Sequence, residues 1–377
     1  MRSGLRHEIA AVCGGNWFQE QAVWSIQVEK TSTMGKLRFA QAGVSLMHAN
    51  MYRDTLMLLA DEIELVGFYD PEPEGVKPNL KADVQDVPFY DSLGELLSEA
   101  KPDAVMVSTY LKDMPAWMLQ VAEAGVHVWG EKPYAVHSSQ LEPVAEAVRR
   151  NNLHFSCGYT WRFHPIANLI KRTWAAGLLG KPYSIEFRFL TSSVARRDPQ
   201  NWYFSRENAG GGILNFLGCH WFDLMRYMTG ADVARVAAIE ANVGGHDIDV
   251  EDAAAVSLAF DNGMIGSLHA GYFTSGDGEI SVGLRGSLGW IKWDVDEGVC
   301  TIKSEHAEWS GAPTRSFEFP SAQVPGYGSE GRSSIKAFAA AIRGEGSSGY
   351  KVEEIIRSLQ IIEAAHASAA EGRTVSL

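Results

Sequence analysis

The chain of 377 residues has few cysteines, no long apolar run and too few basic residues to balance its acidic ones. The four cysteines, Cys13, Cys157, Cys219 and Cys300, are scattered without metal or redox spacing, which favours free thiols in a reducing cytoplasm. No apolar stretch is long enough to cross a bilayer. The formal net charge of −13 would repel a phosphate backbone. We therefore expect a cytoplasmic protein with no metal site and with neither nucleic acid nor membrane as a partner.

The composition and the length of the chain predict a globular protein of more than one domain. Hydrophobic residues make up 46% and charged residues 21%, and 377 residues exceed what one core ordinarily holds. Residues 1–33 show no clear strand or helix period and no secretory signal. We suspect that Met34 is the natural start. Alternatively, Trp17, Phe18 and Trp24 anchor an ordered arm on a neighbouring subunit.

The first part of the chain alternates strand and helix patterns. Two capping boxes, Ser92 with Glu95 and Ser139 with Glu142, mark the starts of a short helix and of a helix that runs to Arg150. This alternation predicts an α/β fold with a doubly wound parallel sheet. We expect strands over 37–42, 63–69, 103–108, 126–129 and 153–157, and further helices over 46–60 and 113–124.

After Gly158 the pattern changes to a run of extended segments. Asp261-Asn262-Gly263 joins two of them as a hairpin turn, and Gly230 ends a helix. Such a run predicts an α+β domain with an open, mostly antiparallel sheet. We expect helices over 165–176, 213–229, 331–343 and 351–371 and strands over 183–190, 233–243, 252–260, 264–273, 279–285 and 288–293. The expected division is an extension over 1–35, a first domain over 36–155 and a second over 156–377.

Gly130-Glu131-Lys132-Pro133 directly follows the strand predicted at 126–129. The carboxyl ends of strands in an open α/β sheet are where ligands bind. A lysine at that edge can place its ammonium beside a reacting oxygen. Taken alone, however, these residues are also compatible with an ordinary polar loop.

The turn after the first strand carries part of a dinucleotide pattern. Gly43, Ser45 and His48 occupy the glycine positions of Gly-x-Gly-x-x-Gly, and only the first is glycine. Asp70 ends the second strand, where an acidic residue meets the ribose hydroxyls of NAD and would repel the 2′-phosphate of NADP. NAD is therefore favoured over NADP. The alternative is a plain strand–helix turn, with Asp70 opening the turn after the second strand.

Further motifs carry a family resemblance. Tyr159-x-x-Arg162 follows the last strand of the first domain, and Ala209-Gly210-Gly211-Gly212 leads to Gly218-Cys219-His220-x-x-Asp223. With the Glu-Lys-Pro motif, these resemble the glucose–fructose oxidoreductase / inositol dehydrogenase / MocA family over residues 36–377. The resemblance implies an NAD(P)-binding Rossmann domain and a second domain on an open sheet. It also implies hydride transfer at a carbinol carbon of a sugar or polyol, and a homodimer or homotetramer formed through the antiparallel sheet.

The resemblance also implies roles for two residues. Lys132 lies by the nicotinamide ribose and the reacting hydroxyl, and His220 acts as general base or proton relay. The chemistry agrees, because an ammonium stabilises an alkoxide and an imidazole exchanges protons near neutrality. Asp223, one turn after His220, is a candidate to orient it. The expected cofactor-binding residues are Gly43, Ser45, His48, Asp70, Ser108, Thr109, Glu131, Lys132 and Pro133; the expected substrate-binding residues are Tyr159, Arg162, Trp202, Asn215 and His220.

The chain departs from the family pattern at the expected site. Phe216 stands where the family usually has aspartate, so that the neighbouring Asn215 becomes a candidate for substrate contact. Thr109-Tyr110-Leu111 replaces the usual Thr-Pro-Asn, and Met114 replaces the histidine that follows it. These departures, together with the degraded glycine pattern, indicate a divergent branch with altered substrate geometry, or one that has lost activity.

Aromatic residues crowd the expected cleft, and Trp202 and Tyr203 are the best candidates to stack on a sugar. Arg162 either holds a substrate oxygen or pairs with an acidic side chain. We predict an NAD-dependent dehydrogenase acting on a ring hydroxyl of a sugar, glycoside or cyclitol. Two alternatives stay open: a glycoside hydrolase or lyase that uses tightly held NAD for transient oxidation, and a non-catalytic sugar or nucleotide sensor.

Overall fold

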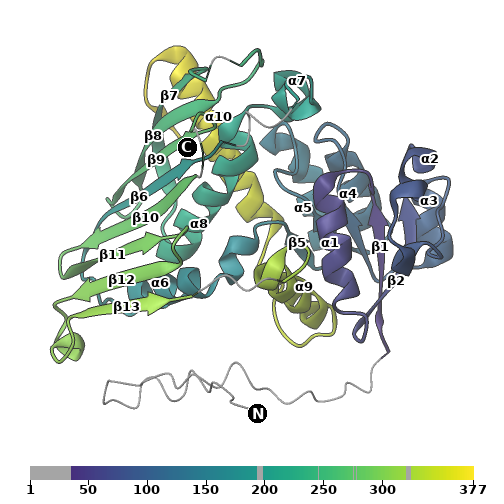
Figure 1. Cartoon of the computed structure of the whole chain (residues 1–377), viewed down its shortest axis with the longest axis horizontal. Coiled ribbons are helices and arrows are strands. Elements are labelled where there is room, and N and C mark those ends of the chain that lie inside the picture. The colour runs from purple at the N-terminus through teal and green to yellow at the C-terminus, as the bar shows by residue number, and fades with distance from the viewer. Residues whose placement is uncertain (1–34, 193–197, 245, 275, 277, 320–323) are drawn as a thin grey trace, which may run out of the picture.

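The computed structural model describes residues 35–192, 198–244, 246–274, 276, 278–319 and 324–377. The expected extension, with its possible anchors Trp17, Phe18 and Trp24, lies outside the described residues except for Gly35. In Figure 1 the described chain forms two sheets, with helices between them and around the first. No helix of the described residues is long and apolar enough to span a membrane.

The first sheet has five parallel strands in the order β2-β1-β3-β4-β5. The predicted doubly wound parallel sheet is therefore confirmed. All four residues of β3 are buried, as expected for a strand covered on both faces. The strands are β1 (Leu37–Ala42), β2 (Ile63–Tyr69), β3 (Ala104–Val107), β4 (His127–Gly130) and β5 (Phe155–Cys157); the longer helices are α1 (Met47–Met57), α4 (Met114–Glu123) and α5 (Glu142–Arg150).

Of the two predicted capping boxes, Ser92 forms the N-cap half of the first, while the Glu95 side chain accepts from the amide of Asp91 instead of Ser92. Ser92 accepts a hydrogen bond from the Glu95 amide at 3.1 Å and begins the short helix α3 (Leu93–Glu95), which continues as a π turn over Leu96–Ala100. The prediction for Ser139 was wrong, because Ser139 lies inside a 3₁₀ turn (Ser138–Leu141) that precedes α5. The side chain of Gln140 instead accepts from the backbone of His137 at 2.8 Å. Other short turns span Pro73–Val76 (α2), Lys77–Asn79 and Ala82–Val84.

The second sheet has nine strands in the order β13-β12-β11-β10-β6-β9-β8-β7-β14. Every neighbouring pair is antiparallel except β6 and β9, which confirms a mostly antiparallel sheet. The strands are β6 (Pro182–Leu190), β7 (Val233–Ala241), β8 (Ala253–Phe260), β9 (Ile265–Gly271), β10 (Glu279–Gly286), β11 (Gly289–Asp294), β12 (Val299–Ser304), β13 (Thr314–Glu318) and β14 (Val375–Ser376).

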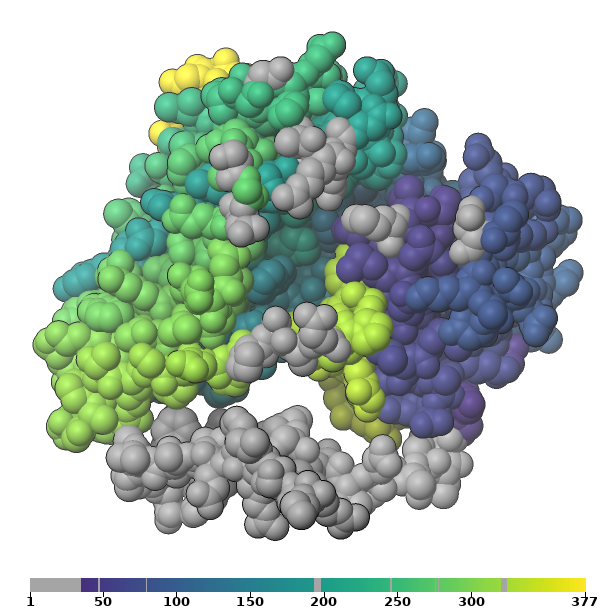
Figure 2. All heavy atoms as spheres, viewed as in Figure 1, coloured from purple at the N-terminus to yellow at the C-terminus, as the bar shows by residue number. Residues whose placement is uncertain are grey.

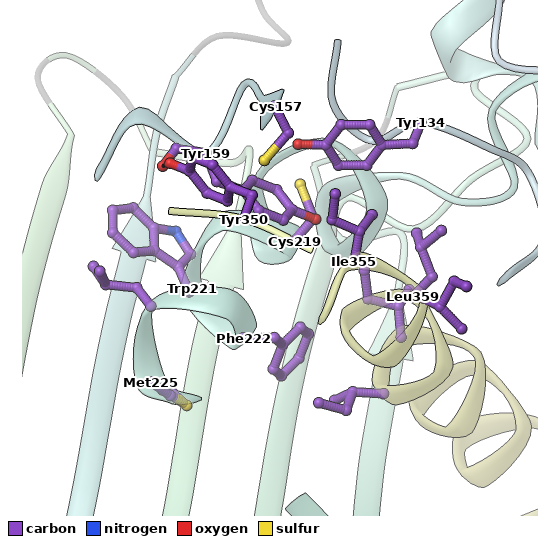
Figure 3. Packing of buried hydrophobic residues seen from close by; sticks show 14 of the residues in the cluster. Tyr134, Cys157, Tyr159, Cys219, Trp221, Phe222, Met225, Tyr350, Ile355 and Leu359 are labelled. Atoms are coloured by element: carbon purple, nitrogen blue, oxygen red, sulfur yellow. Dashed lines mark hydrogen bonds between the residues drawn. The ribbon is translucent and has the colours of Figure 1, made fainter. Parts of the chain in front are cut away.

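Helices cover the face of the second sheet that is turned toward the first sheet (Figure 1). The expected helix over 213–229 is interrupted: a π turn over Leu214–Gly218 leads into α8 (Cys219–Thr229). Figure 3 shows Trp221 of α8 near Tyr159, which follows β5, and Ile355 and Leu359 of α10 further along the same buried cluster. The other helices are α6 (Pro165–Ala175), α7 (Arg206–Ala209) and α10 (Val352–Glu371), with 3₁₀ turns at Thr160–Phe163, Trp202–Phe204 and Ala307–Trp309.

The last part of the chain returns to the first sheet. In α9 (Gly328–Ile342), Ile335 and Phe338 are buried in one cluster with Phe39 of β1 and Trp129 of β4. In addition, β5 continues the first sheet two residues past the boundary expected after 155. The two sheets are therefore tied together by helices from late in the chain, and the division at 155 stays a prediction.

Candidate active site

A cavity of about 430 Å³ lies between the two sheets, past the carboxyl ends of β1, β3 and β4. This is the edge of an open α/β sheet where ligands bind. In Figure 2 the surface is hollowed between the purple N-terminal part and the green strands. Residues from the loops and helix starts that follow strands of the first sheet line one side: Ser45, Leu46, His48, Ser108, Thr109, Leu111, Met114, Glu131 and Lys132. Asn201, Trp202, Tyr203, Phe216, Leu217 and Tyr272 line the other.

Some of the expected site residues line the cavity, and others do not. Among the expected cofactor-binding residues, Ser45, His48, Ser108, Thr109, Glu131 and Lys132 line it, and Trp202 lines it from the opposite side. The remaining expected residues are not among those that line it: Gly43, Asp70, Pro133, Tyr159, Arg162, Asn215 and His220.

The turn between β1 and α1 has the features of a dinucleotide-binding turn. Gly43 has a φ of +84°, and a Cβ there would collide with the backbone carbonyl of Ser108, so only glycine fits. Asp70 is buried, and its Oδ2 accepts from the amides of Val44 at 2.8 Å and Ser45 at 3.1 Å. The turn is therefore held tightly against the end of β2.

The amino end of α1 suits a bound diphosphate. The helix starts without a side-chain cap and without an acidic residue in its first turn, so its first amides are open to an anion. Ser45, just before this helix, is exposed and lines the cavity. Together with the buried Asp70 carboxylate, these donors and acceptors fit a dinucleotide even though the second and third glycines are replaced.

Lys132 is buried, and its position is set from the opposite side of the cavity. Its Nζ donates to the carbonyl oxygen of Phe216 at 2.9 Å and lies 5.3 Å from the centre of the Phe216 ring. Phe216 belongs to the π turn that precedes α8. The ammonium thus bridges the loop after β4 and the start of α8, two segments that are 84 positions apart in the chain.

Glu131, the neighbour of Lys132, pairs with His48. The Oε1 of Glu131 lies 2.6 Å from the Nδ1 of His48, and its carboxylate is buried. The hydroxyls of Tyr52 and Tyr327 lie beside this carboxylate, and burial followed by the Glu131 charge raises the pKa of both tyrosines. Glu131 therefore connects the helix after the glycine turn to the loop that carries Lys132.

His220, on α8, is buried against Tyr159 with 5.5 Å between ring centroids. Its Nδ1 has no hydrogen-bond partner among the described residues. Burial, and then the positive charges of Lys132 and His48, lower the pKa of His220 well below its usual range. The imidazole is therefore neutral near pH 7 and close enough to Lys132 for their charges to interact. Phe216, the partner of Lys132, lies four positions before it in the chain.

Arg162 and Asp223 form a buried ion pair with each other. Arg162 donates through Nε to one oxygen of Asp223 at 2.8 Å and through Nη2 to the other at 2.5 Å, and its Nη1 lies 3.2 Å from Glu354. The structure gives Arg162 an acidic partner, the second of the two roles expected for it. The idea that Asp223 orients His220 was wrong, because both of its oxygens serve Arg162.

Asn215 also lies outside the cavity. Its Oδ1 lies 2.7 Å from the Nε2 of His366 on α10, and its Nδ2 donates to the Ala209 carbonyl at 3.3 Å. Asn215 is 3% exposed and borders a different cavity. The fold therefore does not bring Asn215 to the place where substrate contact was expected.

Several lining residues carried no signal in the sequence. Leu46, Leu217, Asn201 and Tyr272 belong to none of the motifs that point to chemistry, and only the three-dimensional fold brings them to one cavity. The Phe216 carbonyl also had no signal, because backbone groups are identical in every residue. A π turn within a helix is a common mark of functional sites, but it has no sequence pattern of its own.

The chain matches two family models. Residues 37–159 match an oxidoreductase family with an NAD-binding Rossmann fold, and residues 168–292 match the GFO/IDH/MocA C-terminal domain. The chain belongs to the GFO/IDH/MocA family. In this GFO/IDH/MocA protein the first match covers the glycine turn and Lys132, and the second covers the π turn and His220.

Named relatives of this GFO/IDH/MocA chain act on sugars. It is 26% identical over 292 residues to 1,5-anhydro-D-fructose reductase of Ensifer adhaerens. This match covers 76% of this chain and 83% of that protein. It is 27% identical over 174 residues to levoglucosan dehydrogenase of Pseudarthrobacter phenanthrenivorans, covering 40% of this chain and 45% of that protein. Several of these matches span only about half the length of the curated relative.

Solved structures share the fold over almost the whole chain. Levoglucosan dehydrogenase in complex with NADH and levoglucosan superposes with a TM-score of 0.78 at 20% identity, covering 91% of this chain and 99% of that one. GenD2 from gentamicin A biosynthesis in complex with NAD gives a TM-score of 0.76 at 22% identity, covering 91% and 97%. At these identities the likeness concerns the fold alone.

Proposed function

We propose that the protein is an NAD-dependent dehydrogenase that transfers hydride from a ring hydroxyl carbon of a sugar, glycoside or cyclitol. The observation that carries this proposal is the position of Lys132 at the cavity, near the buried His220, which itself lies just outside the cavity lining. Lys132 comes from the first sheet and lines the cavity, and its charge acts on the imidazole of His220 from α8. Family membership and relatives named for sugar and inositol dehydrogenation support the same reaction class.

The residues proposed to hold the cofactor are those of the glycine turn and the loops beside it. The first amides of α1 and Ser45 bind the diphosphate, and Asp70 meets the adenosine ribose. Ser108, Thr109, Glu131 and Pro133 complete the cofactor side, with Gly43 allowing the turn and His48 bracing Glu131. When bound, NAD supplies the hydride acceptor. A buried carboxylate at Asp70 disfavours a 2′-phosphate, and we therefore propose NAD over NADP.

Lys132 and His220 are the residues proposed to act on the oxygen and the proton of the substrate hydroxyl. Lys132 donates to the substrate oxygen in place of, or in addition to, its bond to the Phe216 carbonyl, and its ammonium stabilises the developing alkoxide. His220 is neutral because burial, Lys132 and His48 lower its pKa, so that it can take the hydroxyl proton. The proton passes from the hydroxyl oxygen to the imidazole as the carbon gives up its hydride.

The substrate side of the cavity is mostly aromatic. The ring of Trp202 lies 5.8 Å from the rings of Tyr203 and Phe216, and Tyr110 from the other side of the cavity lies 5.3 Å from Trp202. Aromatic rings stack on the apolar C–H face of a sugar or on an aglycone. Phe216, where the family usually has aspartate, offers a substrate no side-chain acceptor. We therefore propose ring substrates with an apolar face against Trp202 and Phe216.

We also propose that the protein works in the cytoplasm as a homodimer or homotetramer. The described cysteines, Cys157, Cys219 and Cys300, are free and buried, which suits a reducing compartment.

A substrate panel tests the proposed function. Purified protein is mixed with sugars, glycosides and cyclitols together with NAD or NADP, and reduced nicotinamide is followed by absorbance. We expect NAD-dependent turnover of at least one ring substrate and little turnover with NADP. A clear preference for NADP would remove the proposed role of Asp70. Absence of any reduced nicotinamide across the panel would contradict the proposed reaction.

A further inference from the structure

A second group of buried and half-buried polar side chains lies outside the active-site cavity, around His366 of α10. The Nδ1 of His366 lies 2.7 Å from the Oε1 of Glu240 on β7, and its Nε2 lies 2.7 Å from the Oδ1 of Asn215. One ring nitrogen of His366 and one carboxylate oxygen from each of Glu240 and Glu251 lie within 4.8 Å of one another. Asn215 and Glu251 are 3% and 4% exposed. The cluster therefore joins α10, β7, the segment before β8 and the π turn in one buried contact.

These contacts require His366 to carry a proton on each nitrogen. Asn215 uses its Nδ2 as a donor to the Ala209 carbonyl, so its Oδ1 needs a donor from His366. The carboxylate of Glu240 needs a donor from the other nitrogen. With both nitrogens donating, the ring is an imidazolium and has no lone pair to offer a metal ion. His366 thus connects Glu240 and Asn215 by donating a hydrogen bond from each ring nitrogen.

The charges around His366 favour this protonated form. Burial alone would lower the pKa of His366, but the hydrogen bond to Glu240 and the charge of Glu251 outweigh it, so that the pKa is raised. Arg206 of α7 opposes them and lies 3.6 Å from Glu251. The other titratable groups that border the adjoining cavity are His137, Glu207 and Glu363. The ring deprotonates only as the pH rises through this raised pKa.

The glycine-rich segment rests directly on the cluster. A Cβ at Gly211 would lie 2.6 Å from the Nε2 of His366, and a Cβ at Gly212 would collide with the carbonyl of Glu251. The Oε1 of Glu251 accepts from the amides of Gly212 at 2.8 Å and Leu214 at 3.2 Å. The start of the π turn is therefore fixed by Glu251, and its next residue, Asn215, is fixed by His366.

The same π turn holds Lys132. Asn215 is followed by Phe216, whose carbonyl accepts from the Nζ of Lys132 at 2.9 Å. His220 follows on α8. A continuous series of contacts thus runs from His366 through Asn215 and the backbone of Phe216 to the ammonium of Lys132.

We propose that His366 is a positioning residue whose protonated ring holds Asn215, and with it the π turn that places Lys132 and His220. Loss of the Nε2 proton sets a lone pair against the Oδ1 of Asn215, which breaks the contact and frees the turn. This inference rests on the proposed function for its effect on turnover. Its structural part, the coupling between His366 and His220, does not depend on any substrate.

Turnover as a function of pH tests the first consequence. We expect His366→Ala to lower kcat by about ten- to a hundredfold, since small displacements of reacting groups cost that much. His366→Gln should regain most of this loss, because an amide donates to Asn215 at every pH. The wild-type fall in kcat at alkaline pH should be absent in His366→Gln and should move to higher pH in Asn215→Asp, where a carboxylate retains the proton. An alkaline fall that is identical in all three proteins would overturn the proposal.

Histidine NMR tests the coupling without a substrate. In protein labelled at histidine, the ring signals of His220 should shift as His366 titrates, and this shift should vanish in His366→Gln. If the ring signals of His220 do not shift as His366 titrates, the proposal is overturned even in an active enzyme. Coupled signals in a protein that oxidises no sugar would instead contradict only the proposed function. His164→Gln is the matched control, because His164 is another half-buried histidine that packs on Trp293 and makes no contact with the cluster.

Discussion

The surroundings of the two side chains determine which contacts Lys132 makes and why His220 is neutral. Lys132 is held by a backbone carbonyl and an aromatic ring, with no carboxylate hydrogen-bonded to its Nζ among the described residues. His220 is buried beside positive charge. In this arrangement Lys132 can donate a hydrogen bond to the substrate oxygen, and the neutral imidazole of His220 is free to accept a proton.

The pH dependence of catalysis follows from the state of His220. Because the pKa of His220 is lowered, the imidazole stays neutral as the pH falls below about 6.5, where a free histidine would become charged. We predict that kcat/KM for alcohol oxidation declines only at a pH well below that value. The pH profile of initial rates measures this, and His220→Gln should lose the acid decline together with most of the rate. An acid decline centred near 6.5 would contradict the lowered pKa.

The ion pair of Arg162 and Asp223 is a structural element of the second part of the chain. Removing one partner leaves an uncompensated buried charge, so we predict that Arg162→Met lowers the unfolding free energy by about 3–5 kcal/mol. Combining it with Asp223→Leu should restore part of the loss, because no charge is then left unpaired. Urea unfolding measures both. Arg150→Met, which breaks the exposed pair with Glu123, is the control and should change little.

Sequence reasoning identified which residue types carry chemistry but not always where they point. Lys132 and His220 were found because each lies in a short motif beside a predicted strand or helix. Arg162 and Asn215 lie in the same motifs, yet their partners Asp223 and His366 are 61 and 151 positions away in the chain. A single sequence gives no information about such distant pairings, so Asn215 was expected at the substrate and the role of Arg162 stayed open between a substrate oxygen and an acidic partner.

At the scale of elements, the turn after β1 and the π turn before α8 set the geometry. The strands of the first sheet were predicted within one or two residues, because continuous apolar runs and capping residues are local signals. The π turn was missed and read as plain helix, because one extra residue per turn leaves no mark on a short apolar pattern. The strands β12, β13 and β14 were not individually predicted, since short strands late in the chain have weak periodicity.

The glycine turn can be tested by comparing two glycines with similar backbones. Gly43 and Gly125 have φ values of +84° and +76°, but a Cβ at Gly125 would meet nothing within 4 Å. We predict that Gly125→Ala costs only the left-handed backbone strain of about 1–2 kcal/mol. Gly43→Ala adds a collision with Ser108 and should cost about 2–5 kcal/mol and weaken NADH binding. Thermal unfolding and NADH fluorescence measure the two effects, and equal losses in both variants would argue against a tight turn at Gly43.

At the scale of the whole molecule, no helix of the described residues covers the outer face of the nine-stranded sheet (Figure 1). The side chains of Ile239 on β7 and Ile265 on β9 are 74% and 63% exposed. Small residues lie between them on the paired strand β8, where Ala255 is opposite Ile239 and Ala259 is opposite Ile265. Exposed isoleucines with alanines between them, as on this face, are apolar surface of the kind that a subunit interface covers. We propose that a second copy of this chain covers it.

We predict that the double substitution Ile239→Lys and Ile265→Lys lowers the oligomeric state without unfolding the subunit. Light scattering coupled to gel filtration measures the mass, and circular dichroism checks the fold. Leu58→Lys is the matched control, since Leu58 is 40% exposed and lies just after α1, away from the sheet. A wild-type protein that is a monomer at all concentrations would contradict the proposed assembly.

The most direct measurement of the proposed chemistry is a double-variant cycle on Lys132 and His220. The turnover of NAD with a substrate from the panel is compared in the wild type, Lys132→Met, His220→Gln and the double variant. We predict that each single variant loses about a hundred- to a thousandfold in kcat, and that the double variant loses little more, because both groups act on the same oxygen. Near wild-type kcat in either single variant, or losses that multiply as for independent sites, would contradict a shared action on one substrate oxygen.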